Sequence, residues 1–320
     1  MATPKKVLLI NDRFGADTFA DIPHPGIEIT ALPEIDRSRL LEIIADFDAY
    51  IPTLKIKVDR EVIERAQRLQ IVGTPSTGTD HLDLSALEAR GITVQSIKHD
   101  RQVLDQFTGT AELAFGLILT CARHLPLCFE ASRQGQWARE KMAGRQVRDK
   151  TLGLIGVGRL GTMMARYGQA FWMRVIGYDP FLKEFPPGVE KVDLPTLLRD
   201  SDFVSLHVHL TDQTDRMLGA KELHTMKPGS ALINTSRGRL IDEAALIQEM
   251  EAGRIAAAGL DVIDGEWLEN KRDHPLIAYS RKNPRLYITP HVGGTSPEST
   301  RLALRHTFAK IVKFFPSPPA

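Results

Sequence analysis

The chain has few of the features that mark exported or membrane-embedded proteins. It contains only two cysteines, Cys121 and Cys128, and its longest mainly apolar stretch, residues 113–122, is shorter than the ~18 residues that a membrane helix needs. On one predicted helix these cysteines would lie about 10 Å apart, too far for a disulfide, so we expect reduced thiols and a cytoplasmic location. The apolar run at residues 7–10 is too short for a signal peptide, and we expect no export.

Net charge is also nearly absent. The 41 Lys and Arg residues against 40 Asp and Glu residues leave a formal charge of +1, too little to attract a nucleic acid through its phosphates. With 42% hydrophobic and 25% charged residues, the composition is that of a globular protein. A length of 320 residues allows about two domains. We therefore expect small-molecule partners and neither nucleic acid nor membrane.

Short apolar runs alternate with helical patterns along the chain. The first series of predicted strands is 7–10, 27–30, 49–51, 69–72 and 92–94; the second, after an apolar helix at 110–125 and a polar connection, is 152–157, 175–178, 203–208, 231–235, 257–262 and 286–289. Such alternation predicts an α/β fold with parallel sheets. A last helix is expected from about residue 298 to 315, ended by Pro316, Pro318 and Pro319.

A glycine-rich motif follows the first strand of the second series. Gly156, Gly158 and Gly161 form a GxGxxG pattern between a predicted strand and a helix, where backbone N–H groups can approach a pyrophosphate. The next strand ends at Asp179, whose carboxylate can bind ribose hydroxyls and would repel a 2′-phosphate. The pattern predicts NAD as cofactor; the alternative is a turn that only packs a helix on a sheet.

Four further polar residues fall at or just beyond predicted strand ends, where ligands bind in parallel sheets: Arg237, Asp261, Glu266 and His291. A guanidinium suits a carboxylate, and an imidazole, with an ordinary pKa near ~6.5, can exchange a proton while a carboxylate orients it. Together with a hydride acceptor, these groups are what the oxidation of a 2-hydroxy acid requires. The alternative is that Arg237 forms a surface salt bridge and Glu266 is a solvated loop acid. We expect no metal site, since His207 and His209 point to opposite faces of a strand.

The chain resembles the NAD-dependent D-isomer-specific 2-hydroxyacid dehydrogenases in four segments: residues 73–83 (GTPSTGTDHLD), 226–238 (MKPGSALINTSRG), 258–262 (AGLDV) and 289–294 (TPHVGG). The resemblance implies a catalytic triad of Arg237, Glu266 and His291. It also implies two doubly wound parallel-sheet domains: a Rossmann NAD-binding domain at residues 99–294 and a flavodoxin-like substrate domain formed by residues 1–98 and 295–320. A homodimer is implied as well.

The resemblance further implies roles for individual residues. The substrate is expected to contact Ser76, Thr77 and Gly78, together with Arg237 and His291. Contacts with NAD are expected from Thr110, Gly156, Gly158, Arg159, Leu160, Gly161, Asp179, Pro180, His207, Thr214, Thr235, Ser236, Arg237, Asp261, His291, Gly293 and Gly294.

Several positions differ from the family pattern. His209 replaces a frequent proline, and residues 53–57 (TLKIK) lack the Arg-Ser pair common in phosphoglycerate-type relatives. Phosphite dehydrogenases carry a lysine at the position of Thr77, and formate dehydrogenases carry a glutamine at the position of Glu266. The resemblance therefore disfavours both of these activities. The sequence does not fix which 2-hydroxy acid is used. The alternative function is an NAD(H)-responsive, corepressor-like binding protein on the same fold.

Overall fold

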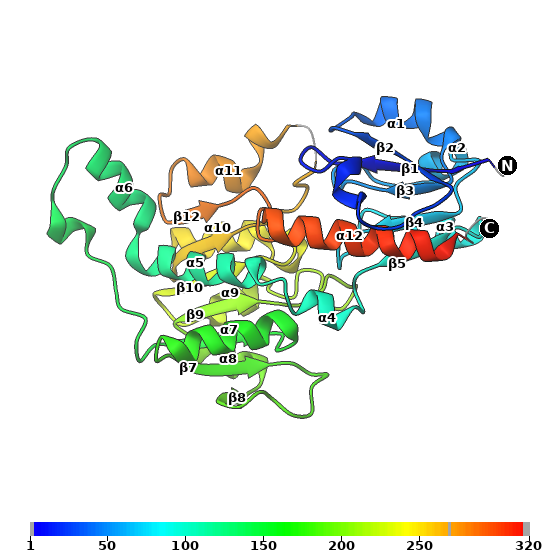
Figure 1. Ribbon diagram of the computed structural model, residues 1–320. Coiled ribbons are helices and arrows are strands. Elements are labelled where there is room, and N and C mark those ends of the chain that lie inside the picture. Colours follow the sequence, from blue (N-terminus) through cyan, green and yellow to red (C-terminus); the bar gives the residue numbers. More distant parts are fainter. Residues whose placement is uncertain (1–2, 268–269, 316–320) are drawn as a thin grey trace. The chain divides into compact units, whose positions relative to one another are not determined.

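The computed structural model describes residues 3–267 and 270–315 (Figure 1). The chain divides into two compact units, Met1–Phe107 with Ser296–Ala320 and Thr108–Thr295, and each is described by itself. The first unit thus extends to Phe107, further along the chain than the expected boundary at residue 98. Pro316, Pro318 and Pro319, predicted to end the last helix, lie outside the described residues.

The first unit is built on a five-stranded parallel sheet in the order β2-β1-β3-β4-β5, the flavodoxin-like order. Its strands are β1 (Lys5–Ile10), β2 (Ile27–Leu32), β3 (Ala49–Ile51), β4 (Ile71–Thr74) and β5 (Thr93–Ser96). Its helices are η1 (Ala16–Phe19), α1 (Arg37–Ile43), η2 (Ile44–Asp46), α2 (Arg60–Arg65), α3 (Leu84–Ala89), α4 (Arg101–Leu104) and α12 (Pro297–Phe314), of which η1 and η2 are 3-10 helices.

Strand β1 shows why this sheet is buried on both faces. Val7 and Leu9 pack in one apolar cluster, and Leu8 and Ile10 pack in another, and none of the four is more than 3% exposed. Helix α12, from the other end of the chain, adds Leu304, Phe308 and Ile311 to the cluster that contains Val7 and Leu9. A continuous apolar run in the sequence is therefore the mark of a strand covered by helices on both sides.

The second unit is built on a seven-stranded parallel sheet in the order β12-β11-β10-β9-β6-β7-β8. Its strands are β6 (Thr151–Ile155), β7 (Arg174–Tyr178), β8 (Val189–Lys191), β9 (Phe203–Leu206), β10 (Ser230–Asn234), β11 (Ile255–Leu260) and β12 (Leu286–Ile288). Its helices are α5 (Gly109–Arg123), α6 (Leu125–Arg133), η3 (Arg139–Met142), α7 (Arg159–Ala170), α8 (Leu194–Asp200), α9 (Ala220–Thr225), η4 (Gly238–Leu240), α10 (Glu243–Glu251), η5 (Lys271–Asp273) and α11 (Pro275–Ser280).

The strand order of this sheet reverses at β6. Strands β7 and β8 follow on one side of β6, and β9 to β12 follow on the other. In doubly wound sheets the ligand crevice opens at such a reversal, beyond the carboxyl ends of the strands. The two parallel sheets with their helices confirm the predicted α/β class and its doubly wound organisation.

The apolar helix predicted around residues 110–125 is α5, but it does not carry both cysteines. His124 adopts a left-handed conformation (φ 54°) that ends α5, and the chain bends by 64° into α6. Cys121 therefore lies on α5 and Cys128 on α6, and both are free thiols. Among the described helices, no single one is long and apolar enough to cross a membrane, although the bent pair 101–123 and 125–133 reaches that length and composition together.

Candidate active site

The glycine motif forms the turn between β6 and α7. Gly156 has a φ of +89°, and a Cβ there would lie 2.6 Å from the carbonyl oxygen of His207. A Cβ on Gly161 would lie 2.2 Å from the oxygen of Gly156, so the first turn of α7 can approach β6 only with glycine at this position. At Gly158, which precedes α7, a Cβ would meet open space. The turn therefore leaves backbone exposed at a helix N-terminus, as a pyrophosphate site requires.

Asp179, directly after β7, is held at this turn by its own hydrogen bonds. Its Oδ2 accepts from the backbone N–H of Val157 at 3.0 Å, and its Oδ1 accepts from that of Phe181 at 3.0 Å. Pro180, which was also predicted to contact NAD, lies between Asp179 and Phe181 in the sequence. The acid that the sequence links to the ribose hydroxyls is thus fixed beside the glycine turn.

Two buried polar atoms at the ends of neighbouring strands β9 and β10 have no hydrogen-bond partner among the described residues: Nδ1 of His207 and Oγ1 of Thr235. His207 Nε2 lies 2.9 Å from Ser205 Oγ, and burial lowers the pKa of His207 to about 4, so the ring is neutral. Unpartnered buried polar atoms are costly, and a polar cofactor would satisfy them. The exposed turn backbone, Asp179 and these two atoms fit a dinucleotide.

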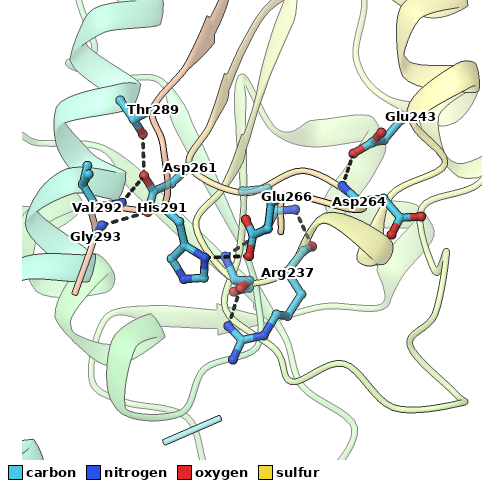
Figure 2. Close-up of polar contacts among 11 residues, drawn as sticks. Arg237, Glu243, Asp261, Asp264, Glu266, Thr289, His291, Val292 and Gly293 are labelled. Atoms are coloured by element: carbon cyan, nitrogen blue, oxygen red, sulfur yellow. Dashed lines mark hydrogen bonds and ion pairs between the residues drawn. The ribbon is translucent and has the colours of Figure 1, made fainter. Parts of the chain in front are cut away.

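Asp261, directly after β11, anchors the loop that carries His291. Its side chain is buried, and its Oδ1 accepts from Thr289 Oγ1 at 2.5 Å and from the Val292 N–H at 2.9 Å. Its Oδ2 accepts from the Gly293 N–H at 2.8 Å, and its carbonyl oxygen accepts from the His291 N–H at 2.8 Å. Figure 2 shows this carboxylate among the residues that flank His291. The loop after β12 is therefore tied to the end of β11 on both sides of His291.

His291 and Glu266 form a close pair. Glu266 Oε1 lies 2.7 Å from His291 Nδ1, and the two side chains are 16% and 22% exposed (Figure 2). A carboxylate accepts, so Nδ1 carries the hydrogen and Nε2 is left to exchange a proton with a ligand. The His291 backbone has a φ of 54°, a costly conformation that the bonds to Asp261 and Glu266 hold in place. The ring of Trp267 lies 5.6 Å from the His291 ring.

Arg237 follows β10 in a turn fixed by Asn234. The buried Asn234 amide donates to the carbonyl oxygen of Arg237 at 2.8 Å and accepts from the Ser236 N–H at 2.9 Å. Ser236 Oγ donates to the carbonyl oxygen of Leu206 on β9 at 2.8 Å, and the Arg237 guanidinium donates to the carbonyl oxygen of Ser236 at 2.7 Å. Asn234 was not predicted; its only signal in the sequence is an amide side chain at the end of an otherwise apolar strand.

The remaining predicted residues fall in three places. Thr110, in the first turn of α5, lies against the loop after β12: Cβ atoms on Gly293 and Gly294 would lie 3.4 Å from its Cγ2 and 4.0 Å from its Oγ1. Arg159 and Leu160 begin α7. Thr214 lies in the loop after β9, where its hydroxyl donates to the carbonyl oxygen of His209 at 2.7 Å.

Ser76, Thr77 and Gly78 belong to the first unit and follow β4. Ser76 Oγ donates to the carbonyl oxygen of Gly78 at 2.5 Å and lies 2.9 Å from Thr74 Oγ1, which closes a tight polar loop at the carboxyl end of the sheet. Within residues 3–267 and 270–315, no three His, Cys, Asp or Glu side chains are grouped as a metal site would require.

Comparison with known proteins gives a consistent result. The family profile described as the NAD binding domain of D-isomer specific 2-hydroxyacid dehydrogenases matches residues 115–293. A hydroxypyruvate reductase of Thermotoga maritima is 34% identical over 287 residues, which are 90% of each chain. A D-3-phosphoglycerate dehydrogenase of Methanocaldococcus jannaschii is 34% identical over 300 residues, and this chain covers 55% of its length.

Solved structures agree with the sequence matches. The D-lactate dehydrogenase of Aquifex aeolicus, crystallised with NAD and lactic acid, superimposes with a TM-score of 0.81 at 27% identity, over 96% of this chain and 94% of that one. All three of these proteins are named as enzymes, so the comparisons give no support to the alternative of a cofactor-responsive binding protein.

Proposed function

The chain belongs to the D-isomer-specific 2-hydroxyacid dehydrogenase family, and from that premise we propose that Arg237, Glu266 and His291 catalyse hydride transfer between NAD(H) and C2 of a small 2-hydroxy or 2-keto acid. The observation that carries the proposal is the 2.7 Å pair of Glu266 and His291 in the unit that contains the NAD-binding profile. Bound NAD(H) would supply or accept the hydride.

In this proposal His291 moves the proton. Glu266 holds Nδ1, so Nε2 gives a proton to the carbonyl oxygen of a keto acid during reduction and removes it from the hydroxyl group during oxidation. The carboxylate also stabilises the charged imidazolium that reduction requires. The fixed backbone of His291 keeps the ring in place, so little reorganisation is needed in the transition state.

Arg237 would bind the substrate carboxylate. Its planar guanidinium offers paired N–H groups that match two carboxylate oxygens, and the Asn234 turn fixes the backbone from which the side chain extends. Ser76, Thr77 and Gly78 of the first unit are also proposed as substrate contacts. The unit of residues 1–107 with 296–320 is therefore proposed as the substrate domain, and the unit of residues 108–295 as the NAD-binding domain.

The proposed acids follow the names of relatives, namely hydroxypyruvate, glyoxylate and lactic acid, or the corresponding hydroxy and keto acids. The cofactor residues given above would contact NAD, with Asp179 favouring NAD over NADP.

We propose a homodimer, since Phe129 and Trp137, on and after α6, are 59% and 85% exposed. Two free thiols suit the reducing cytoplasm.

The test is NADH oxidation with purified protein and a panel of glyoxylate, hydroxypyruvate, pyruvate and a phosphorylated keto acid, repeated with NADPH. Turnover of at least one acid with NADH supports the proposal. Tight NADH binding without turnover of any acid would reject it, and a change in partner binding or oligomeric state with NADH would then favour the binding-protein alternative.

A further inference from the structure

The segment that carries Glu266 is held by two side chains from outside the proposed triad. Glu243, in the first turn of α10, accepts a hydrogen bond from the backbone N–H of Asp264 through Oε1 at 2.7 Å. His274, which precedes α11, lies with Nε2 2.8 Å from the carbonyl oxygen of Asp264. A carbonyl only accepts, so Nε2 of His274 carries the hydrogen. Both polar groups of the Asp264 backbone are thus bound by side chains, and Figure 2 shows the bond from Glu243.

Glu243 and His274 are also close to each other. Glu243 Oε2 lies 3.4 Å from His274 Nε2, and the side chains are only 16% and 14% exposed. Burial raises the pKa of Glu243, whereas the hydrogen bond from the Asp264 backbone N–H and the charges of His274 and Arg216 act in the opposite direction. A carboxylate whose charged form is penalised by burial lowers the free energy of unfolding at neutral pH. Glu243 and His274 thus form a largely buried pair against the backbone of Asp264.

The peptide that these two residues hold also contacts the Arg237 turn. A Cβ on Gly238, the residue after Arg237, would lie 2.1 Å from the carbonyl carbon of Ile263 and 2.2 Å from the nitrogen of Asp264. The Arg237 turn therefore rests directly on the peptide between Ile263 and Asp264. A shift of the peptide between Ile263 and Asp264 would therefore move both the Arg237 turn that rests on it and Glu266, which follows two residues later.

Gly265 separates the held peptide from Glu266. Its φ of +70° lies in the left-handed region, which glycine enters without steric cost, and glycine also leaves this region easily. Without a restraint on Asp264, rotation at Gly265 would let the Glu266 carboxylate leave His291. Glu243 and His274 supply that restraint.

We propose that Glu243 and His274 are positioning residues, which fix the 263–264 peptide so that Glu266 stays paired with His291 beside the Arg237 turn. Only the expected effect on turnover rests on the proposed function. The effect on the loop itself can be measured without any activity.

Glu243→Ala is the main test, with Glu222→Ala as the matched control because Glu222 is the first-turn acid of neighbouring α9. In Glu243→Ala we expect kcat for NADH-dependent reduction of hydroxypyruvate, glyoxylate or pyruvate to fall about 10-fold or more, with little change in the KM for NADH. We also expect the pH profile of kcat to change, since Glu266 would no longer be held beside the His291 ring. A role limited to folding would leave that pH profile unchanged.

Two more variants and a second readout complete the test. Glu243→Gln keeps an oxygen that can accept from Asp264 and should restore kcat to within about threefold of wild type. Amide hydrogen exchange in residues 262–266 should be about 10-fold faster in Glu243→Ala than in Glu222→Ala. If Glu243→Ala does not fold, His274→Ala should show the same loss of kcat and the same faster exchange.

Unchanged exchange and an unchanged pH profile in a folded Glu243→Ala or His274→Ala protein would overturn the inference, as would a Glu243→Gln variant as impaired as Glu243→Ala. Absence of turnover in the wild-type protein would reject the proposed function instead, and the exchange measurement would then decide the positioning role alone.

Discussion

Glu266 and His291 are joined at 2.7 Å between Oε1 and Nδ1, and the same unit contains a second pair of the same chemistry: His224 Nδ1 and Glu249 Oε1, 3.0 Å apart on α9 and α10. The two pairs differ in their surroundings. The His291 side chain is 22% exposed at the end of a strand, whereas that of His224 is 67% exposed on a helix. This second pair, in which only His224 is exposed, provides matched controls for variants of the proposed catalytic pair.

Glu266→Gln should lower kcat about 10-fold and change the pH profile of reduction. A neutral amide can still contact Nδ1 but no longer stabilises the imidazolium electrostatically. Steady-state kinetics across pH test this, with Glu249→Gln as control. Equal pH profiles for Glu266→Gln and wild type would remove Glu266 from the proposed mechanism.

His291→Ala should lower kcat by ~100-fold or more while NADH binding remains nearly intact, because the proton carrier is lost and the glycine turn is untouched. Turnover assays and NADH fluorescence titration measure the two effects separately. His224→Ala should leave both nearly unchanged. Normal turnover by His291→Ala would contradict the assigned role.

Arg237→Lys should raise the KM for the keto acid about 10- to 100-fold, since an ammonium group cannot bind two carboxylate oxygens in the planar geometry of a guanidinium. Arg239→Lys is the control, because Arg239 lies two positions further on and pairs with Asp215. Similar KM values for both variants and wild type would show that Arg237 does not bind substrate.

Asp179→Ser should weaken NADH binding about 10-fold and raise the ratio of NADPH to NADH affinity. The variant loses a charge that repels a 2′-phosphate, and it also loses the acceptor that holds the Val157 N–H in the glycine turn. Titration with both cofactors gives the ratio directly. An unchanged ratio would exclude Asp179 as the selectivity residue.

Acid should destabilise the fold through His207. In the unfolded chain a histidine has its ordinary pKa of 6.5, whereas burial lowers the pKa of His207 to about 4 in the folded protein. The unfolded chain thus takes up the proton first, so the stabilisation present above pH 6.5 is lost as the pH falls toward 4.

Denaturant unfolding as a function of pH measures this effect of His207. His207→Gln, which does not titrate, should lose less stability than wild type over that range, by up to roughly 1.4 kcal/mol per pH unit. His99→Gln, at an exposed position, should behave as wild type. Parallel pH curves for His207→Gln and wild type would contradict the prediction.

Residues at strand ends could be predicted from the sequence. The carboxyl ends of parallel strands lie at one edge of the sheet, however far apart the strands are along the chain. His291 lies shortly after β12 and Glu266 in the loop after β11, and their side chains lie 2.7 Å apart. Asn234, Glu243 and His274 could not be predicted in the same way. Their roles depend on which backbone groups of other segments they meet, and only the folded loops determine that.

Local conformations were harder to predict than elements. The sequence predicts one helix for both cysteines, yet a single left-handed residue, His124, separates α5 from α6. The strand β8, with the polar sequence Val-Glu-Lys, is stabilised by its pairing with β7 rather than by an apolar pattern of its own. Local composition says little about the backbone conformation of a single residue. It says equally little about the pairing of a strand with a segment that is distant in the sequence.

The first unit joins two segments, residues 3–107 and 296–315, that are far apart along the chain. On the ribosome, β1 to β5 emerge long before α12, whereas residues 108–295 can complete their own unit first. Until Leu304, Phe308 and Ile311 arrive, Val7 and Leu9 lack part of their apolar cover. Residues 3–107 produced as a fragment should therefore aggregate, and a separate peptide containing residues 296–315 should rescue their solubility.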